Sequence, residues 1–493
     1  MSGGHGVASS NLASPNYSLF LVVSRHLSPS HKTCYEQGEI RDRAELKGSS
    51  SLNKVKKVYL ESLGCNKNTV DSEIMLSILK EKGFERTNSP EDASAIIVNT
   101  CAFIDPAKEE AISAILELGR RKREGARLIV AGCLPQIHHR AVLDELPEVD
   151  AVVGVGNLEA LLEAVEHNGT GERDFPSSRF IGGSYREYAA GRELFTPPGC
   201  AYLKISEGCS RACSFCIIPA IRGKLRSRAP DSIVEEAKQL EKKGVRELVL
   251  TSQDTLGYGL DIGAGLDRLV ERLLSETGIS LIRLLYLRPG NELLRALGVF
   301  ENERVLRYFD IPVQHVSKKV LRDMNRGGDH DEYIGMVDTL RTRFEDAVLR
   351  TTLIVGFPGE GAAEFELLQA FVEEARFDHL GVFSFSPQEG TAAFSFKGRV
   401  GKKTAEERKK RLLELQRGIS RERLSRSVGR DFEVLVEERV AGKNLYLGRS
   451  RHFAPEVDGV FVLESGRDLR PGDLVWARVT RSDDYDLHGT LLR

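Results

Sequence analysis

The sequence contains no apolar run long enough to cross a membrane. In its first fifty residues the one apolar run, Leu19–Val23, is far too short. Neither charge sign dominates, because 70 Lys and Arg residues stand against 72 Asp and Glu residues. The resulting net charge of −2 excludes a global electrostatic attraction to nucleic acid or to a membrane surface.

The opening segment also lacks the features of a secretory signal. Residues 1–16 are mostly polar and have neither a basic start nor a long apolar stretch. Acidic residues are absent before Glu36, so an organelle transit peptide remains an alternative to a disordered extension over residues 1–55. We expect a cytoplasmic protein with no membrane partner.

The 493 residues exceed one ordinary domain, and their pattern predicts three. Short apolar runs at Val58–Ser62, Ala95–Asn99, Leu128–Ala131 and Ala151–Val153 alternate with helical stretches. Of these stretches, Asp71–Lys82 is amphipathic, and Asp105-Pro106 is a typical helix start with Asp as the cap. This alternation predicts an α/β fold that begins with an open parallel sheet over residues 56–168.

Further elements follow a Gly- and Ser-containing linker at 169–199. Six strand candidates separated by helices predict a partial (β/α)6 barrel over residues 200–426. They are Tyr202–Ile205, Glu247–Thr251, Leu281–Leu287, Tyr308–Ile311, Arg350–Val355 and His379–Phe385. After the charged helix 402–426, residues 427–493 are strand-rich and punctuated by Gly, which indicates a small antiparallel β-barrel.

Two groups of three cysteines stand out among the eight in the chain. In the first triad, Cys65, Cys101 and Cys133 each follow a predicted strand of the first sheet. The carboxyl ends of parallel strands open into one crevice, so we expect these thiols to converge on an iron–sulfur cluster. The alternatives are three inert core cysteines, or a zinc site completed by His138 or His139.

The second triad, Cys209, Cys213 and Cys216, follows the first barrel strand. Three local thiolates on a cubane leave one iron without a protein ligand, and that iron can bind a cofactor. Cys34 and Cys200 have no cysteine partners at ligand spacing, and we interpret both as ordinary cysteines.

The Cys-x3-Cys-x2-Cys spacing after the first strand of such a barrel resembles the radical S-adenosylmethionine superfamily. The phrases Ser62-Leu-Gly-Cys65, Val98-Asn-Thr-Cys101 and Ala131-Gly-Cys133-Leu look like the N-terminal domain of its methylthiotransferase family, and the C-terminal segment resembles that family's TRAM barrel. The resemblance runs from about Lys56 to the C-terminus. It implies two 4Fe-4S clusters, one on each triad, and S-adenosylmethionine as cofactor.

The same resemblance implies particular residues and a mechanism. Phe215 matches an aromatic residue beside the adenine, and Thr352–Glu360 resembles a strand-end motif near it, which suggests Gly356 and Glu360 as cofactor-binding residues. One S-adenosylmethionine would methylate a sulfur on the first cluster. A second would be cleaved at the other cluster to a radical that takes hydrogen from the substrate carbon, with a protein such as flavodoxin or ferredoxin as reductant.

The substrate is the β-carbon of an aspartate of small-subunit ribosomal protein twelve in one branch of the family, and a tRNA adenosine in another. Phrases such as Ser252-Gln-Asp-Thr255 and Asp483-Asp-Tyr-Asp486 are similar to the first branch. From Asp431 to Arg493, acidic residues outnumber basic ones by 12 to 9, which suits a basic protein better than RNA. Nucleic acid would be a partner only in the tRNA alternative.

Substrate-binding candidates follow from these phrases. They are Arg222, Lys224, Asp483, Asp484 and Asp486. Arg222 and Lys224, with Arg226 and Arg228, would hold a carboxylate, unless this segment is only a solvated basic loop. A non-catalytic iron–sulfur or zinc protein that binds the ribosome is the alternative from another class.

Overall fold

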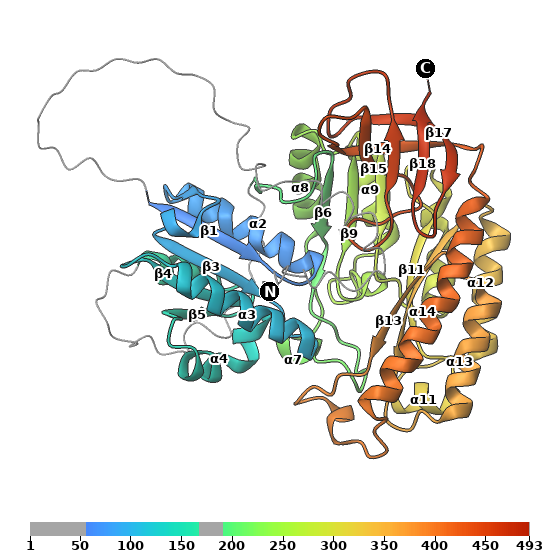
Figure 1. The fold of residues 1–493 in the computed structure, drawn as a ribbon, viewed down its shortest axis with the longest axis horizontal. Coiled ribbons are helices and arrows are strands. Elements are labelled where there is room, and N and C mark those ends of the chain that lie inside the picture. Colours follow the sequence, from blue (N-terminus) through green and yellow to red (C-terminus); the bar gives the residue numbers. More distant parts are fainter. Residues whose placement is uncertain (1–55, 167–190, 493) are drawn as a thin grey trace, which may run out of the picture.

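The computed structural model of this chain describes residues 56–166 and 191–492 (Figure 1). The expected extension over 1–55 and most of the expected linker, 169–190, lie outside these residues. The described part forms an open sheet, a central barrel and a small C-terminal barrel, in that order along the chain. This arrangement confirms the predicted fold class.

The first sheet has five parallel strands in the order β2-β1-β3-β4-β5. They are β1 (Lys57–Ser62), β2 (Glu85–Arg86), β3 (Ala95–Thr100), β4 (Arg127–Gly132) and β5 (Ala151–Val153). The four predicted strands are confirmed. The additional strand β2 has two exposed residues at the sheet edge, too few to show a hydrophobic period.

Helices cover both faces of this sheet. They are α2 (Asn66–Glu81), α3 (Asp105–Arg121), α4 (Cys133–Glu145) and α5 (Leu158–Glu166), with the short η1 (Pro90–Asp92). Alternate residues of β3 face opposite ways, Ile97 toward α2 and α5 and Ile96 toward α3 and α4. Because both faces are covered, the strands read as continuous apolar runs.

Two helix starts differ from prediction. Helix α2 begins at Asn66, five residues before Asp71. Its first turn is polar and therefore lacks the apolar pattern that predicts a helix, although its residues are buried. Asp105 is the first residue of α3 and makes no cap hydrogen bond. It is held instead by Gln388, whose Nε2 donates to the Asp105 carboxylate over 3.1 Å.

The central barrel contains the six predicted parallel strands, arranged as two three-stranded sheets, β6-β9-β10 and β11-β12-β13. The strands are β6 (Cys200–Lys204), β9 (Glu247–Thr251), β10 (Leu281–Leu284), β11 (Tyr308–Gln314), β12 (Val348–Val355) and β13 (His379–Ser384). The two sheets meet where the Leu287 N–H donates to the Asp310 carbonyl over 2.8 Å. The barrel order is therefore confirmed.

The remaining elements of this unit surround the strands. The helices are α7 (Ile218–Arg222), α8 (Pro230–Lys242), α9 (Leu266–Glu276), α10 (Asn291–Arg295), α11 (Lys318–Asp323), α12 (His330–Arg343), α13 (Ala362–Ala375) and α14 (Lys402–Ser425). Short 3₁₀ turns are η2 (Thr255–Gly257), η3 (Ala296–Glu301) and η4 (Ala392–Ser395), and a small ladder pairs β7 (Ser206–Glu207) with β8 (Arg226–Ser227). In the described part of the chain, no helix is both long enough and apolar enough to span a bilayer.

The C-terminal unit is a closed five-stranded barrel in the order β14-β15-β16-β18-β17. Its strands are β14 (Asp431–Arg439), β15 (Leu445–Arg449), β16 (Phe461–Glu464), β17 (Leu474–Ser482) and β18 (Leu487–Leu491). Four of its pairings are antiparallel, as predicted, but β16 pairs with β18 in parallel because the chain crosses over through β17.

This small barrel packs on the amino-terminal ends of the central strands (Figure 1). Glu247, the first residue of β9, binds Arg449 over 2.8 Å and Arg283 over 2.7 Å, and all three side chains are buried. The Tyr308 hydroxyl, at the start of β11, donates to Asp458. The carboxyl ends of the central strands therefore stay open to the first sheet.

Candidate functional site

The first triad lies along the carboxyl edge of three adjacent strands. Cys65 follows β1 and precedes α2, Cys101 follows β3, and Cys133 is the first residue of α4. The strands approach so closely that a Cβ added to Gly64 would lie 2.6 Å from the Cys101 Cβ and 3.2 Å from its Sγ. Gly64 also has a φ of +94°, so the loop needs glycine at this position.

The electrostatics of this triad favour a positively charged occupant. Burial, together with the neighbouring thiols of Cys133 and Cys65, raises the pKa of Cys101 to about 12. The pKa of Cys133 is also raised, mainly by burial. Burial would raise the pKa of Cys65 too, but the charges of Lys67 and Arg222 outweigh it and lower that pKa. Three free thiols that oppose one another's ionisation suit the irons of a cluster.

Polar side chains hold the loops of the first triad in place. Asn68 donates through Nδ2 to the carbonyls of Leu63 and Thr100, both over 2.9 Å. Asn99 donates to the Asn68 carbonyl and the Ser72 hydroxyl, while its own Oδ1 is buried without a hydrogen-bond partner.

A single metal ion finds no such support. Within residues 56–166 and 191–492, no three His, Cys, Asp or Glu side chains are placed to bind one ion.

The second triad occupies the loop between β7 and α7, beyond the carboxyl end of β6. Gly208 has a φ of +76°, and a Cβ there would lie 2.2 Å from the Lys224 carbonyl oxygen. The Cys209 N–H donates to the Gly223 carbonyl over 3.0 Å, and the Arg211 N–H donates to the Cys209 Sγ over 3.4 Å. Burial raises the pKa of Cys216 to about 12.

An aromatic cluster lies beside the second triad. Phe215 packs with Phe357, Phe385, Phe396 and Met324. The Phe357 and Phe385 rings meet edge to face with centroids 5.1 Å apart. An apolar aromatic wall next to the thiols has the chemistry to hold a purine ring.

Gly356 and Glu360 form the turn after β12. Glu360 is buried, and its Oε2 accepts the Gly356 N–H over 2.8 Å while its Oε1 accepts from Arg408. The carboxylate thus fixes the backbone of the turn. Direct contact of either residue with a cofactor stays a prediction.

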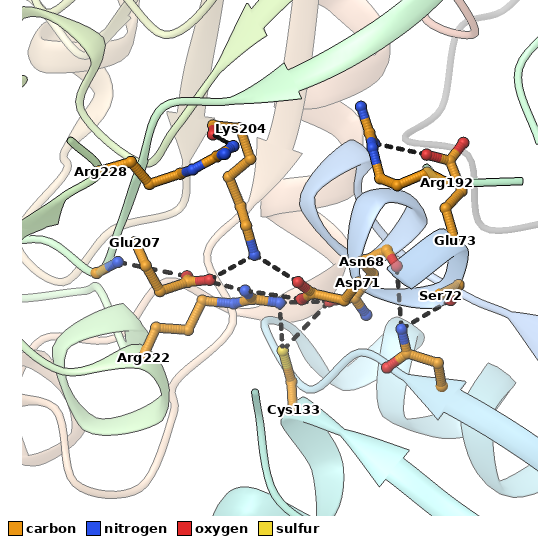
Figure 2. Close-up of polar contacts among 12 residues, drawn as sticks. Asn68, Asp71, Ser72, Glu73, Cys133, Arg192, Lys204, Glu207, Arg222 and Arg228 are labelled. Atoms are coloured by element: carbon orange, nitrogen blue, oxygen red, sulfur yellow. Dashed lines mark hydrogen bonds and ion pairs between the residues drawn. The ribbon is translucent and has the colours of Figure 1, made fainter. Parts of the chain in front are cut away.

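A buried network of charges joins the two triads (Figure 2). It consists of Asp71 and Asn68 from α2, Lys204 from β6, Glu207 from β7 and Arg222 from α7. The Arg222 guanidinium donates to the Glu207 carboxylate over 2.9 Å, to Asp71 over 3.1 Å and to the Cys133 Sγ over 3.5 Å. Lys204 pairs with the same two carboxylates.

This network changes the interpretation of the basic segment. The solvated-loop alternative is wrong for Arg222 and for Arg228, because both are buried and ion-paired. Arg222 faces the first triad rather than an open substrate site. Lys224 is exposed, and its contact with substrate stays a prediction.

The acidic substrate candidates lie at the β17–β18 hairpin, and each already has a partner. Asp483 binds Arg481 over 2.6 Å, and Asp484 binds Arg421 of α14 over 2.5 Å. Asp486 is buried and accepts the Val460 N–H over 2.8 Å, so the structure gives it a place in the barrel wall instead of the docking surface. Docking through Asp483 and Asp484 stays a prediction.

Sequence reasoning missed Lys204, Glu207 and Tyr286. Lys204 is a charged residue at the end of an otherwise apolar barrel strand, and that interruption could have marked it. Tyr286 has a φ of +59° just beyond β10, an uncommon conformation for a bulky residue, and its ring lies 3.6 Å from the Lys67 Nζ. No sequence pattern reveals such a backbone.

Three family models match the chain. Residues 57–154 match "Uncharacterized protein family UPF0004", residues 203–372 match the radical SAM superfamily, and residues 428–492 match the TRAM domain. Among solved structures, the radical S-adenosylmethionine methyltransferase TsrM from Kitasatospora setae, with cobalamin and a [4Fe-4S] cluster bound, superposes with a TM-score of 0.50. It covers 69% of this chain and 77% of its own at 15% identity, a likeness of fold alone.

Curated relatives are far more similar. Ribosomal protein uS12 methylthiotransferase RimO from Desulforamulus reducens is 43% identical over 442 residues, which are 88% of this chain and 99% of the relative. The protein of the same name from Aquifex aeolicus is 44% identical, over 88% of this chain and 96% of its own. This chain therefore belongs to the RimO family of ribosomal protein uS12 methylthiotransferases within the radical S-adenosylmethionine enzymes.

Proposed function

We propose that this chain adds a methylthio group to the β-carbon of an aspartate of ribosomal protein uS12. The observation that carries the proposal is the pair of cysteine triads joined by one buried charge network, on a chain 43% identical to a uS12 methylthiotransferase. The target carbon is unactivated, so its hydrogen is not accessible to proton transfer and radical chemistry is required.

In this proposal the six triad cysteines hold the two clusters. Cys65, Cys101 and Cys133 would bind one 4Fe-4S cluster, and Cys209, Cys213 and Cys216 the other. When bound, these clusters and S-adenosylmethionine supply one-electron chemistry and the sulfur and methyl groups. Phe215 and its aromatic neighbours provide an apolar wall for the adenine.

The proposal also includes the cellular compartment, the electron donor and the protein partner. We place the reaction in the cytoplasm, where a reducing compartment keeps the seven cysteines of the described chain free. A small one-electron carrier protein such as flavodoxin or ferredoxin would supply the electron. The acidic balance of the C-terminal barrel, 12 to 9, supports a basic protein partner over RNA.

Mass spectrometry of uS12 tests the proposal. We expect one aspartate of uS12 to gain a single methylthio group in cells that carry this gene, and to lack it when the gene is deleted. A gene encoding Cys213→Ala should not restore the modification, while a gene encoding Glu438→Gln, at an exposed position of β14, should. A methylthiolated tRNA adenosine with unmodified uS12 would overturn the substrate assignment.

A further inference from the structure

The network between the triads contains one side chain that touches both halves of the site. We propose that Arg222 is a positioning residue that fixes the first cluster against the central barrel and raises the reduction potential of that cluster. This inference rests on the proposed function, because it requires a cluster on Cys65, Cys101 and Cys133.

The contacts of Arg222 support the positioning role. Its Nη2 donates to the Cys133 Sγ over 3.5 Å and to the Asn68 Oδ1, so it reaches both the thiol and the residue that holds the thiol loops. Its Nη1 donates to the carboxylate of Glu207, two residues before Cys209 of the second triad. One rigid, planar group therefore joins the sulfur of one triad to the loop of the other (Figure 2).

The charges of the network are arranged so that a positive group lies toward the first triad. Two carboxylates, Asp71 and Glu207, are shared by two cations, Lys204 and Arg222. Arg222 donates from this group to the Cys133 Sγ of the first triad. The positive end of a nearly neutral buried group thus points at the first triad, and the side chain of Arg222 is only 1% exposed.

Physical chemistry links this arrangement to a potential. Reduction adds negative charge to a cluster, and hydrogen bonds to its sulfurs together with nearby positive charge stabilise the reduced state. Water screens charges weakly at a buried site, so the effect of Arg222 is larger there than on a surface.

If Arg222 only stabilised the fold, the two variants would give a different result from the one that our proposal predicts. Removing either member of a structural ion pair would loosen the site, and both variants would then change the cluster in the same way. Our proposal expects opposite signs. Arg222→Gln removes the positive charge, whereas Glu207→Gln removes the negative charge that compensates it.

The experiment uses the full chain with Cys209, Cys213 and Cys216 replaced by Ala, so that the first cluster is observed alone. Reconstituted protein is titrated with reductant at controlled potential and followed by electron paramagnetic resonance. Arg192→Gln is the matched control. Arg192 is a buried arginine that also joins α2 to the barrel, through Glu73 over 2.6 Å and Glu236 over 2.8 Å.

The expected results differ in sign. In Arg222→Gln the ratio of reduced to oxidised cluster at a fixed potential should fall at least tenfold, equivalent to about 59 mV for a one-electron couple. In Glu207→Gln the ratio should rise, and in Arg192→Gln it should not change. An unchanged ratio in Arg222→Gln, or shifts of the same sign in the first two variants, would overturn the proposal.

Two further outcomes separate this inference from the proposed function. If Arg222→Gln does not retain a cluster, the test rests on Glu207→Gln. A raised ratio of reduced to oxidised cluster in that variant supports the proposal, and any other result contradicts it. If the parent protein with native Arg222 holds no iron on the first triad, the cluster assignment itself fails. Unmodified uS12 with both clusters present would instead count only against the substrate.

Discussion

At the scale of single residues, the two sets of cysteines lie on different parts of the fold. The thiols of the first triad lie on an open sheet and those of the second on one loop of the barrel, so each set can be removed without touching the other. Arg326 donates to the Cys213 Sγ of the second triad over 3.8 Å, and Arg222 donates to the Cys133 Sγ of the first over 3.5 Å. The separation allows a test by substitution.

Cys213→Ala and Cys101→Ala should have different effects. Two cubanes hold about eight irons per chain, so each variant should retain about half of the iron. Cys213→Ala should abolish formation of 5′-deoxyadenosine, whereas Cys101→Ala should leave it largely intact. Iron analysis and chromatography of the products check this. Cys200→Ala, at a buried position outside both triads, is the control and should retain all the iron.

At the scale of elements, the last residue of β15, Arg449, helps to attach the C-terminal barrel to the central one. Glu247 of β9 lies between Arg449 and Arg283. Burial by itself would raise the pKa of Glu247, but the two guanidinium groups outweigh it and lower that pKa from 4.5 to about 2. The carboxylate therefore stabilises the folded protein fully above pH 4.5, and this contribution is lost as the pH falls from 4.5 toward 2.

The variant Glu247→Gln measures how much the Glu247 carboxylate stabilises the folded protein. At pH 7 the free energy of unfolding of the cluster-free protein should fall by about 3 kcal/mol, since two buried arginines lose a charged partner. The difference from wild type should narrow as the pH falls below 4.5. Denaturant titrations at several pH values measure it, with the exposed Glu438→Gln as control. A difference that is independent of pH would contradict the role of the Glu247 charge.

The hairpin of β17 and β18 limits a simple test of partner binding. Asp484 accepts from Arg421 and lies 3.9 Å from Arg417, both on α14. Reversing its charge would place like charges together and loosen the hairpin, and Asp486 is buried in the barrel wall. Asp483 is therefore the better position for testing docking of uS12.

At the scale of the whole molecule, the first sheet and the central barrel are joined by buried ion pairs. Arg192 binds Glu73 of α2 and Glu236 of α8, and it donates to the Tyr202 carbonyl over 2.6 Å. This residue belongs to the expected linker, yet it is buried. The described end of that segment, 191–199, is thus part of the packed structure, while the predicted domain boundaries stay a prediction.

Arg192→Gln should lower the stability of the junction between the two units while leaving their native arrangement in place. Glu73 would lose its cation and Glu236 would keep only Arg228, so the free energy of unfolding should fall by about 3 kcal/mol. Calorimetry of the cluster-free protein should show the first sheet unfolding before the barrel, whereas the wild type should show one joint transition. Arg86→Gln removes an exposed pair to Glu193 and should change stability by less than about 1 kcal/mol. Equal losses in the two variants would contradict this account.

The sequence by itself determined the order of elements and the identity of the chemistry. Apolar runs such as Ala95–Asn99 are local signals, and the six barrel strands and both triads follow from patterns only a few residues long. The placement of each triad after strand ends was predictable for the same reason, because parallel strands direct their carboxyl ends to one edge.

Only the tertiary structure decided how the charged residues are used. Arg222 meets an aspartate 151 residues away and Lys204 meets the same one 133 residues away, so no local pattern distinguishes them from a solvated basic loop. The same holds for Asp486, which closes a barrel wall, and for the β16–β18 pairing. Long-range packing determines which charges lose water, and burial in turn determines whether a charge binds a substrate, supports a fold or acts on a cluster.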